Sequence, residues 1–330
     1  MLRNTLKTLM GAWGPSGNER NVRDEITALL TGHVDQMYTD ALGNLIVEKY
    51  GTDDNARRIM ISAHMDQIGF VVAAVEEEGY LRISAVGGVS VDMSRARHVV
   101  FENGVDGVLF CQPVKEGKPT LSDFYVDIGA KDREEALEMV QLGDMCVYAP
   151  DIFPVGKHKM AGPAMDDRCA CALLVELLNY ADNQKNTIVA VFSSQEEVGL
   201  RGATVAAYGI KPDLGIAIDV TGAGDIPEQK LPAVNLGEGP AVKFIDRSLI
   251  ASPKVRELLF DAAEQAGVKV QREVLPYGGT DGGAIQHAGA GIPAGTLSIP
   301  CRYVHTACET IDMRDMEDAL KVLLQFVEIA

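Results

Sequence analysis

The chain has 330 residues, 47% of them hydrophobic, and carries a formal net charge of −17 at pH 7. This length allows a large folded core, while so strong a negative charge disfavours binding to nucleic acids and to anionic membrane surfaces. No apolar run approaches the roughly 18 residues of a membrane-spanning helix, no signal peptide is recognisable at the start, and the six cysteines form no C-x-x-C pair. We therefore expect a cytoplasmic protein.

The first 68 residues combine helical spacing with strand-like runs. A helical pattern comes first and is interrupted by the breaker GPSGNE, and apolar strand-like runs follow it. The expected elements are helices at 3–11 and 19–31 and strands at 44–50 and 57–66.

The segment 69–157 has a different texture. Short β-like runs such as FVVAAV, YLRISAV and DMCVYAP follow one another with Gly turns between them, and one helix-like stretch at 131–143 interrupts them. Short strands at close spacing predict a small β-rich, barrel-like module.

From residue 158 onward, helical patterns alternate with buried-strand patterns. The expected helices lie at 169–181, 201–209, 252–267 and 312–330, and the expected strands at 186–194, 213–220, 269–275 and 294–300. The Gly-rich stretches 221–240 and 276–284 are interpreted as loops. This alternation predicts an α/β domain with a covered, largely parallel sheet, made of residues 1–68 and 158–330 and interrupted by the insert 69–157.

Polar side chains gather at the carboxyl ends of the expected strands, where open α/β sheets place their functional groups. Five such ends carry His64, Asp66, Asp166, Asp167, Glu196, Glu197, Asp219 and His305. Taken singly, each has an ordinary role as a hydrogen-bonded histidine, a helix cap or a turn former. Together, carboxylates that converge on one sheet edge would repel each other unless a cation lay between them.

Histidine and carboxylate ligands without thiolate suit Zn²⁺, Co²⁺ or Mn²⁺. The number of ligands is sufficient for two ions about 3.5–4 Å apart with a bridging carboxylate. Residues two apart on a strand face the same way, so Asp66 can accept the second ring N–H of His64 and fix its orientation. The sequence therefore predicts a two-metal site.

Other chemistries are less well supported by the residues. Ser193 and Ser194 lack a G-x-S-x-G nucleophile elbow, and the runs GAGDIP and GGTDGG lack the GK[ST] of a phosphate loop. Cys301 and Cys308 flank His305, but no second Cys/His pair is placed to complete a thiolate zinc site.

Five segments, SAHMDQIGF, GPAMDDR, SSQEEVGLRGA, IAIDV and PCRYVHTACE, resemble in order and spacing the metal-site motifs of the tetrahedral aminopeptidases. These cytosolic dinuclear metallopeptidases are also called glutamyl or deblocking aminopeptidases, and some carry the name cellulase or endoglucanase. The resemblance covers essentially the whole chain. It implies a zinc-peptidase-like α/β sheet flanked by helices, an insert that mediates dimerisation, and dimers that assemble into a hollow tetrahedral dodecamer. The run HTACE departs from the Ser-Pro that often follows the last histidine, which puts the local turn in doubt.

The resemblance also implies a role for each matching residue. Two ions, Zn²⁺ or Co²⁺, would be held by His64 with Asp219, by His305 with Glu197, and by Asp166 as the bridge between them. Glu196 would be the general base and Asp66 the residue that orients His64. The Asp166–Asp167 peptide bond would be cis, as in related enzymes.

The prediction is thus a metal-dependent aminopeptidase that acts on peptides. A dinuclear amidohydrolase or deacylase of N-acyl amino acids would use the same ligands. A glycosidase built on Glu196 would leave His64 and His305 without a role, and a non-catalytic assembly protein would have no need of the complete ligand set. The side-chain preference is not readable, because Lys243, Arg247 and Arg302 are equally consistent with a basic pocket and with structural salt bridges.

Overall fold

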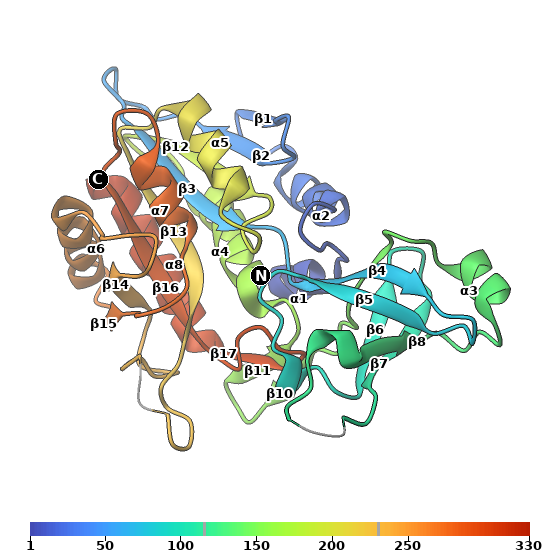
Figure 1. Ribbon diagram of the computed structural model, residues 1–330. Coiled ribbons are helices and arrows are strands. Elements are labelled where there is room, and N and C mark those ends of the chain that lie inside the picture. Colours follow the sequence, from blue (N-terminus) through green and yellow to red (C-terminus); the bar gives the residue numbers. More distant parts are fainter. Residues whose placement is uncertain (115–116, 230–231) are drawn as a thin grey trace.

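The computed structural model describes residues 1–114, 117–229 and 232–330, which form an α/β body with a β-barrel at one side (Figure 1). Across these three stretches, no helix combines the length and the apolar character needed to cross a membrane.

The body is built on one mixed sheet of eleven strands. Its order is β1 (Gln36–Thr39), β2 (Leu45–Lys49), β12 (Thr187–Ser193), β3 (Arg58–His64), β13 (Leu214–Gly222), β16 (Ala294–Arg302), β17 (Glu309–Asp312), β11 (Lys159–Gly162) and β10 (Phe153–Val155), with β14 (Ala241–Ile245) and β15 (Gln271–Val274) branching from β16. The four central strands β12, β3, β13 and β16 are parallel, and antiparallel strands extend both edges. The predicted parallel sheet is therefore confirmed at its centre.

Both faces of the sheet are covered by helices. In β3, Ile59 and Ile61 face one core, and Met60 between them faces another, as strand alternation requires. The first core contains side chains of α1 (Leu2–Gly11), α2 (Arg20–Leu30), α4 (Met165–Tyr180), α6 (Pro253–Gln265) and α8 (Met313–Ile329). The second contains side chains of α5 (Arg201–Ile210) and α7 (Asp281–His287). Burial on both sides explains why β12 consists of buried residues throughout.

The barrel has its own apolar core, which includes Phe70, Leu81, Val99, Leu109 and Phe124. Six antiparallel strands close it in the order β4 (Gly69–Val75), β5 (Leu81–Val86), β8 (Phe124–Asp127), β7 (Asp106–Cys111), β6 (Arg97–Phe101) and β9 (Met145–Tyr148). The helix α3 (Arg133–Met139) lies in the connection before β9, and the short turns η1 (Val91–Met93) and η2 (Leu121–Asp123) lie in the connections before β6 and β8. All six strands lie inside the predicted insert 69–157, while β10 already pairs with the main sheet.

Two sequence interpretations were wrong or incomplete. The stretch 276–284 is not all loop, because α7 begins at Asp281. The strands β1, β8, β10, β11, β14 and β17 were not predicted. Each has only three to five residues, too few for an alternating pattern to stand out from the loops around them.

Candidate metal centre

The central parallel strands end side by side, and this register brings the predicted site residues together. Ser193, the last residue of β12, lies opposite His64, the last residue of β3, and Asp219 lies in β13, which pairs with β3 on its other side. A pocket of about 650 Å³ opens over these strand ends and is lined by His64, Asp166, Glu196, Glu197, Asp219 and His305. Asp66, fully buried, lies behind this lining.

Asp166 lies between the two histidines. Its Oδ1 is 3.0 Å from Nε2 of His64, and its Oδ2 is 3.3 Å from Nε2 of His305. One carboxylate that faces two imidazoles with different oxygens has the position expected of a bridging ligand. The Asp166–Asp167 peptide bond is cis, as the resemblance implied.

The remaining acids lie around this histidine–aspartate–histidine arrangement. Glu197 Oε2 is 3.2 Å from Nε2 of His305, while Asp219 Oδ1 is 4.0 Å from Nε2 of His64. Two groups have potential ligand atoms within 4.8 Å of one another: His64, Asp166 and Glu197, and His64, Asp167 and Asp219. Both groups contain His64, and the second contains Asp167, which was not among the predicted ligands. The predicted partners of His305 were Glu197 and Asp166, and both lie within 3.3 Å of its Nε2.

The electrostatics of the pocket fit a bound cation. Burial, together with the charges of neighbouring carboxylates, raises the pKa of Glu196 and Asp219 well above their usual values. Burial opposes a positive charge on His305, but Glu197 and Asp166 outweigh it and raise the pKa of that histidine to about 12. Glu197 Oε1 is buried without a hydrogen-bond partner among the described residues. A divalent ion would relieve the repulsion and satisfy this oxygen, and imidazole with carboxylate is a donor set that suits Zn²⁺ or Co²⁺.

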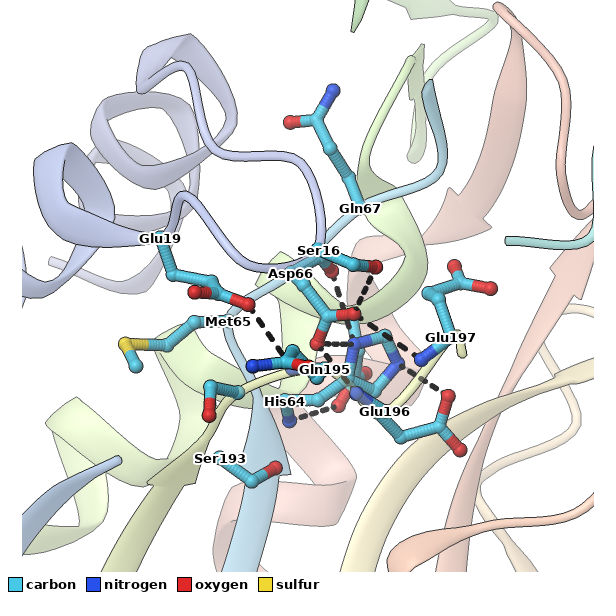
Figure 2. Close-up of polar contacts among 12 residues, drawn as sticks. Ser16, Glu19, His64, Met65, Asp66, Gln67, Ser193, Gln195, Glu196 and Glu197 are labelled. Atoms are coloured by element: carbon cyan, nitrogen blue, oxygen red, sulfur yellow. Dashed lines mark hydrogen bonds and ion pairs between the residues drawn. The ribbon is translucent and has the colours of Figure 1, made fainter. Parts of the chain in front are cut away.

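Asp66 connects three parts of the site (Figure 2). Its carboxylate accepts hydrogen bonds from Ser16 Oγ at 2.6 Å and from the backbone N–H groups of Glu196 and Glu197 at 2.9 and 3.1 Å. His64 Nδ1 is 3.0 Å from the carbonyl oxygen of Asp66 and 3.5 Å from its Oδ1. The predicted contact of Asp66 with His64 is therefore present, mainly through the carbonyl, while the carboxylate holds the turn that carries both glutamates.

This turn explains how two adjacent glutamates face one pocket. Gln195 and Leu200, on either side of the pair, have left-handed φ values of 57° and 56°, so the strand alternation that would separate the two side chains stops before Glu196. The N–H of Gln195 donates to Glu19 at 3.0 Å, which fixes the start of the turn.

We predict that Asp66→Asn lowers activity or metal affinity roughly 10–100-fold, the usual effect of losing a residue that orients ligands. An amide has one oxygen and cannot accept the three bonds that the two carboxylate oxygens accept. Asp213→Asn is a matched control, because Asp213 accepts one backbone N–H, from Arg58, at the opposite end of β3. Metal content and kcat measured on both variants test the role, and wild-type values for Asp66→Asn would rule it out.

Sequence reasoning missed Glu309, which ties two predicted ligands together. Its Oε1 accepts the backbone N–H of His305 at 2.6 Å, and its Oε2 accepts that of Asp166 at 3.0 Å. Tyr303 and His305 have left-handed φ values of 61° and 63°, a conformation that surrounding contacts must hold in place. Glu309 supplies such a contact, so the turn HTACE keeps its last histidine fixed without Ser-Pro.

Two further buried residues support the site from behind. Asp281, interpreted from sequence as part of a turn, accepts hydrogen bonds from Ser62 and Ser193 at 2.6 and 2.5 Å, which joins β3 to β12 just before their functional ends. The guanidinium of Arg168 donates to carbonyl oxygens of Met65 and of the N-terminal segment, at Leu9, Ala12 and Gly14. Neither residue belongs to a periodic pattern, so the available signals were the place of Arg168 at the end of the segment GPAMDDR and that of Asp281 in the Gly-rich stretch 276–284.

Comparison with known proteins gives a consistent result over both parts of the chain. The M42 glutamyl aminopeptidase family model matches residues 43–322. A relative from Acetivibrio thermocellus, provisionally named as an aminopeptidase, is 43% identical over 324 residues, which are 98% of this chain and 97% of the relative. The structure of aminopeptidase APDkam598 from Desulfurococcus kamchatkensis has a TM-score of 0.96 and 36% identity and covers 100% of this chain and 95% of that one. The TET1 peptidase of Pyrococcus horikoshii, which can assemble into a tetrahedron or a large octahedral shell, has a TM-score of 0.91 and 31% identity over the full length of both chains.

Proposed function

The chain belongs to the M42 glutamyl aminopeptidase family and is a peptidase, and from this premise we propose that it removes N-terminal residues from peptides with the help of two divalent metal ions. The observation that carries the metal part of the proposal is the position of Asp166, whose two oxygens face the two histidines at 3.0 and 3.3 Å. Family membership favours the peptidase over the related deacylase.

We assign the ligands in two groups that share Asp166. His64 and Asp219 would hold one ion, and His305 and Glu197 the other; the contacts of both histidines with Asp166 support this division. Zn²⁺ and Co²⁺ are the ions that we propose. When bound, they supply Lewis acidity, which lowers the pKa of water and stabilises negative charge on a carbonyl oxygen.

Glu196 is the proposed general base. Its side chain lines the pocket, while the N–H of its own backbone is fixed by Asp66. From there the carboxylate takes a proton from the attacking water and returns it to the leaving amine. Glu197, whose Oε2 faces His305 at 3.2 Å, is left to hold an ion. The excess of carboxylates in the pocket attracts the free α-ammonium group of a peptide.

We also propose that residues 1–68 and 158–330 form the catalytic domain and that the barrel, as part of the insert 69–157, mediates dimerisation. We propose further that the dimers assemble into a tetrahedral dodecamer and that the protein acts in the cytoplasm. The ability of the TET1 relative to form a tetrahedron supports this assembly. A mass measurement of the native protein in solution distinguishes a dodecamer from a dimer.

The function is tested by removing the metal. We expect the full chain to hydrolyse aminoacyl-p-nitroanilides, to lose this activity after EDTA treatment, and to regain it with Zn²⁺ or Co²⁺. Elemental analysis of the active protein should find about two ions per chain. N-acyl amino acids serve as the control substrates and should not be cleaved. Absence of metal-dependent hydrolysis of every nitroanilide would contradict the proposal, and preferential cleavage of N-acyl amino acids would favour a deacylase.

A further inference from the structure

The pocket over the strand ends has an uneven distribution of charge. Among the described residues that line it, the charged side chains are His64, Asp166, Glu196, Glu197, Asp219 and His305, all of which belong to the proposed metal centre. The rest of the described lining is uncharged, and its larger apolar and aromatic side chains are Met93, Leu200, Val220, Ile226, Leu275, Tyr277, Tyr303 and Val304.

The three basic residues that the sequence offered as pocket cations are placed elsewhere. Lys243 is fully buried, with its Nζ 2.5 Å from Glu273 and 3.9 Å from Asp246. Arg302 donates to both oxygens of Asp225, at 2.9 and 2.6 Å, and Arg247 is exposed to solvent. None of the three basic residues belongs to the described lining of the pocket. Lys243 and Arg302 are therefore held by structural carboxylates, while Arg247 donates its backbone N–H to the carbonyl oxygen of Gly278 at the edge of the pocket and its side chain is not part of the described lining.

Part of the apolar wall lies directly beside the strand end that carries Asp219. The Tyr277 hydroxyl lies 3.7 Å from the position that a Cβ atom would occupy on Gly222, the last residue of β13. The side chain of Leu275 lies 3.6 Å from the corresponding position at Gly278, and that of Leu200 lies 4.0 Å from the one at Gly279, where Ser248 is closer, at 3.0 Å. Leu200, Leu275 and Tyr277 all line the pocket, and we call the part of the pocket that these three side chains line the recess.

We infer that this recess receives the N-terminal side chain of the substrate and selects an uncharged, apolar one such as leucine, methionine or phenylalanine. The inference rests on the proposed aminopeptidase function and specifies its substrate class. Among the described residues that line the pocket, an acidic side chain would find no cation outside the proposed metal centre, and a basic one would find no carboxylate outside it. A desolvated charge without a partner is costly, whereas an apolar side chain gains from burial against Leu200 and Leu275.

The first test compares substrates on the metal-loaded full chain. We expect kcat/KM for leucine, methionine and phenylalanine p-nitroanilides to exceed that for glutamate, aspartate and lysine p-nitroanilides roughly 100-fold or more, because the second set must bury an unpaired charge. An equal or higher value for glutamate or lysine would overturn the inference while leaving the aminopeptidase function intact. Absence of hydrolysis of all six substrates would instead count against the aminopeptidase function.

The second test adds a cation to the recess. Tyr277 is 48% exposed, so Tyr277→Arg can be made without burying a new charge in the core. We expect it to shift the ratio of glutamate to leucine hydrolysis towards glutamate at least about tenfold, as a nearby opposite charge does. Val274→Arg is the matched control, since Val274 is 59% exposed in the same segment and does not line the pocket. An equal shift in both variants, or none with Tyr277→Arg, would overturn the placement of the recess.

Discussion

Replacing Glu196 by glutamine should lower kcat roughly 10²–10⁴-fold, the contribution of a general base, and leave the metal content close to that of the wild type. Glutamine keeps the size of the side chain and its place in the pocket, but it cannot accept a proton at neutral pH. The backbone of the residue stays fixed, because the hydrogen bond from its N–H to Asp66 does not involve the side chain. Single-turnover kinetics on an aminoacyl-p-nitroanilide, together with elemental analysis, measure both quantities.

Glu197→Gln is the most informative control for this result. The two residues are adjacent and their N–H groups donate to the same carboxylate, yet only Glu197 has an oxygen 3.2 Å from His305. We therefore expect Glu197→Gln to lose metal as well as activity, and added Zn²⁺ or Co²⁺ to restore part of that activity. If the effects were exchanged, with metal lost from Glu196→Gln and retained in Glu197→Gln, the assignment of base and ligand would have to be reversed.

The convergence of the site could be predicted because it follows from strand geometry. Parallel strands end at the same edge of a sheet, so His64 and Asp219, 155 positions apart in the chain, were expected at one edge once their runs were identified as buried strands, and the pairing of β3 with β13 makes them neighbours. A β-rich, barrel-like module was likewise recognisable from short strands at close spacing, although the sequence did not show that its strands close into a barrel. Both features depend on local patterns of apolar residues.

The roles of the supporting residues could not be predicted, because their partners are distant in the chain: Glu309 closes the segment PCRYVHTACE, but nothing local shows what its carboxylate binds. Glu309 accepts a hydrogen bond from Asp166, 143 residues earlier, and Asp281 accepts one from Ser62, 219 residues earlier. In the sequence both look like ordinary acids in polar turns. The roles of Lys243 and Arg302 were also undecidable, since a salt bridge and a pocket cation require the same residue type. Only the positions of Glu273 and Asp225 separate the two cases.

The largest loss of metal is expected from Asp166→Asn. Asp166 is the residue with close contacts to both histidines, so its replacement affects both proposed ion sites, whereas His305→Ala would affect one. Asparagine offers a single carbonyl oxygen and turns an N–H₂ group towards the other ion. We expect metal content to fall from about two ions to less than one per chain. The loss of activity should exceed the roughly 10–100-fold caused by disturbing a residue that only orients a ligand.

Asp167→Asn provides the contrast, because it makes the same substitution at the next residue. Asp167 accepts the backbone N–H of His64 at 3.3 Å, and one of its carboxylate oxygens lies within 4.8 Å of potential ligand atoms of His64 and Asp219. If it supports the site only from behind, its variant should keep both ions and lose less activity than Asp166→Asn. Should Asp167→Asn lose metal while Asp166→Asn keeps it, Asp167 and not Asp166 would be the bridging residue. Elemental analysis of the two purified variants therefore decides which aspartate of the pair bridges the ions.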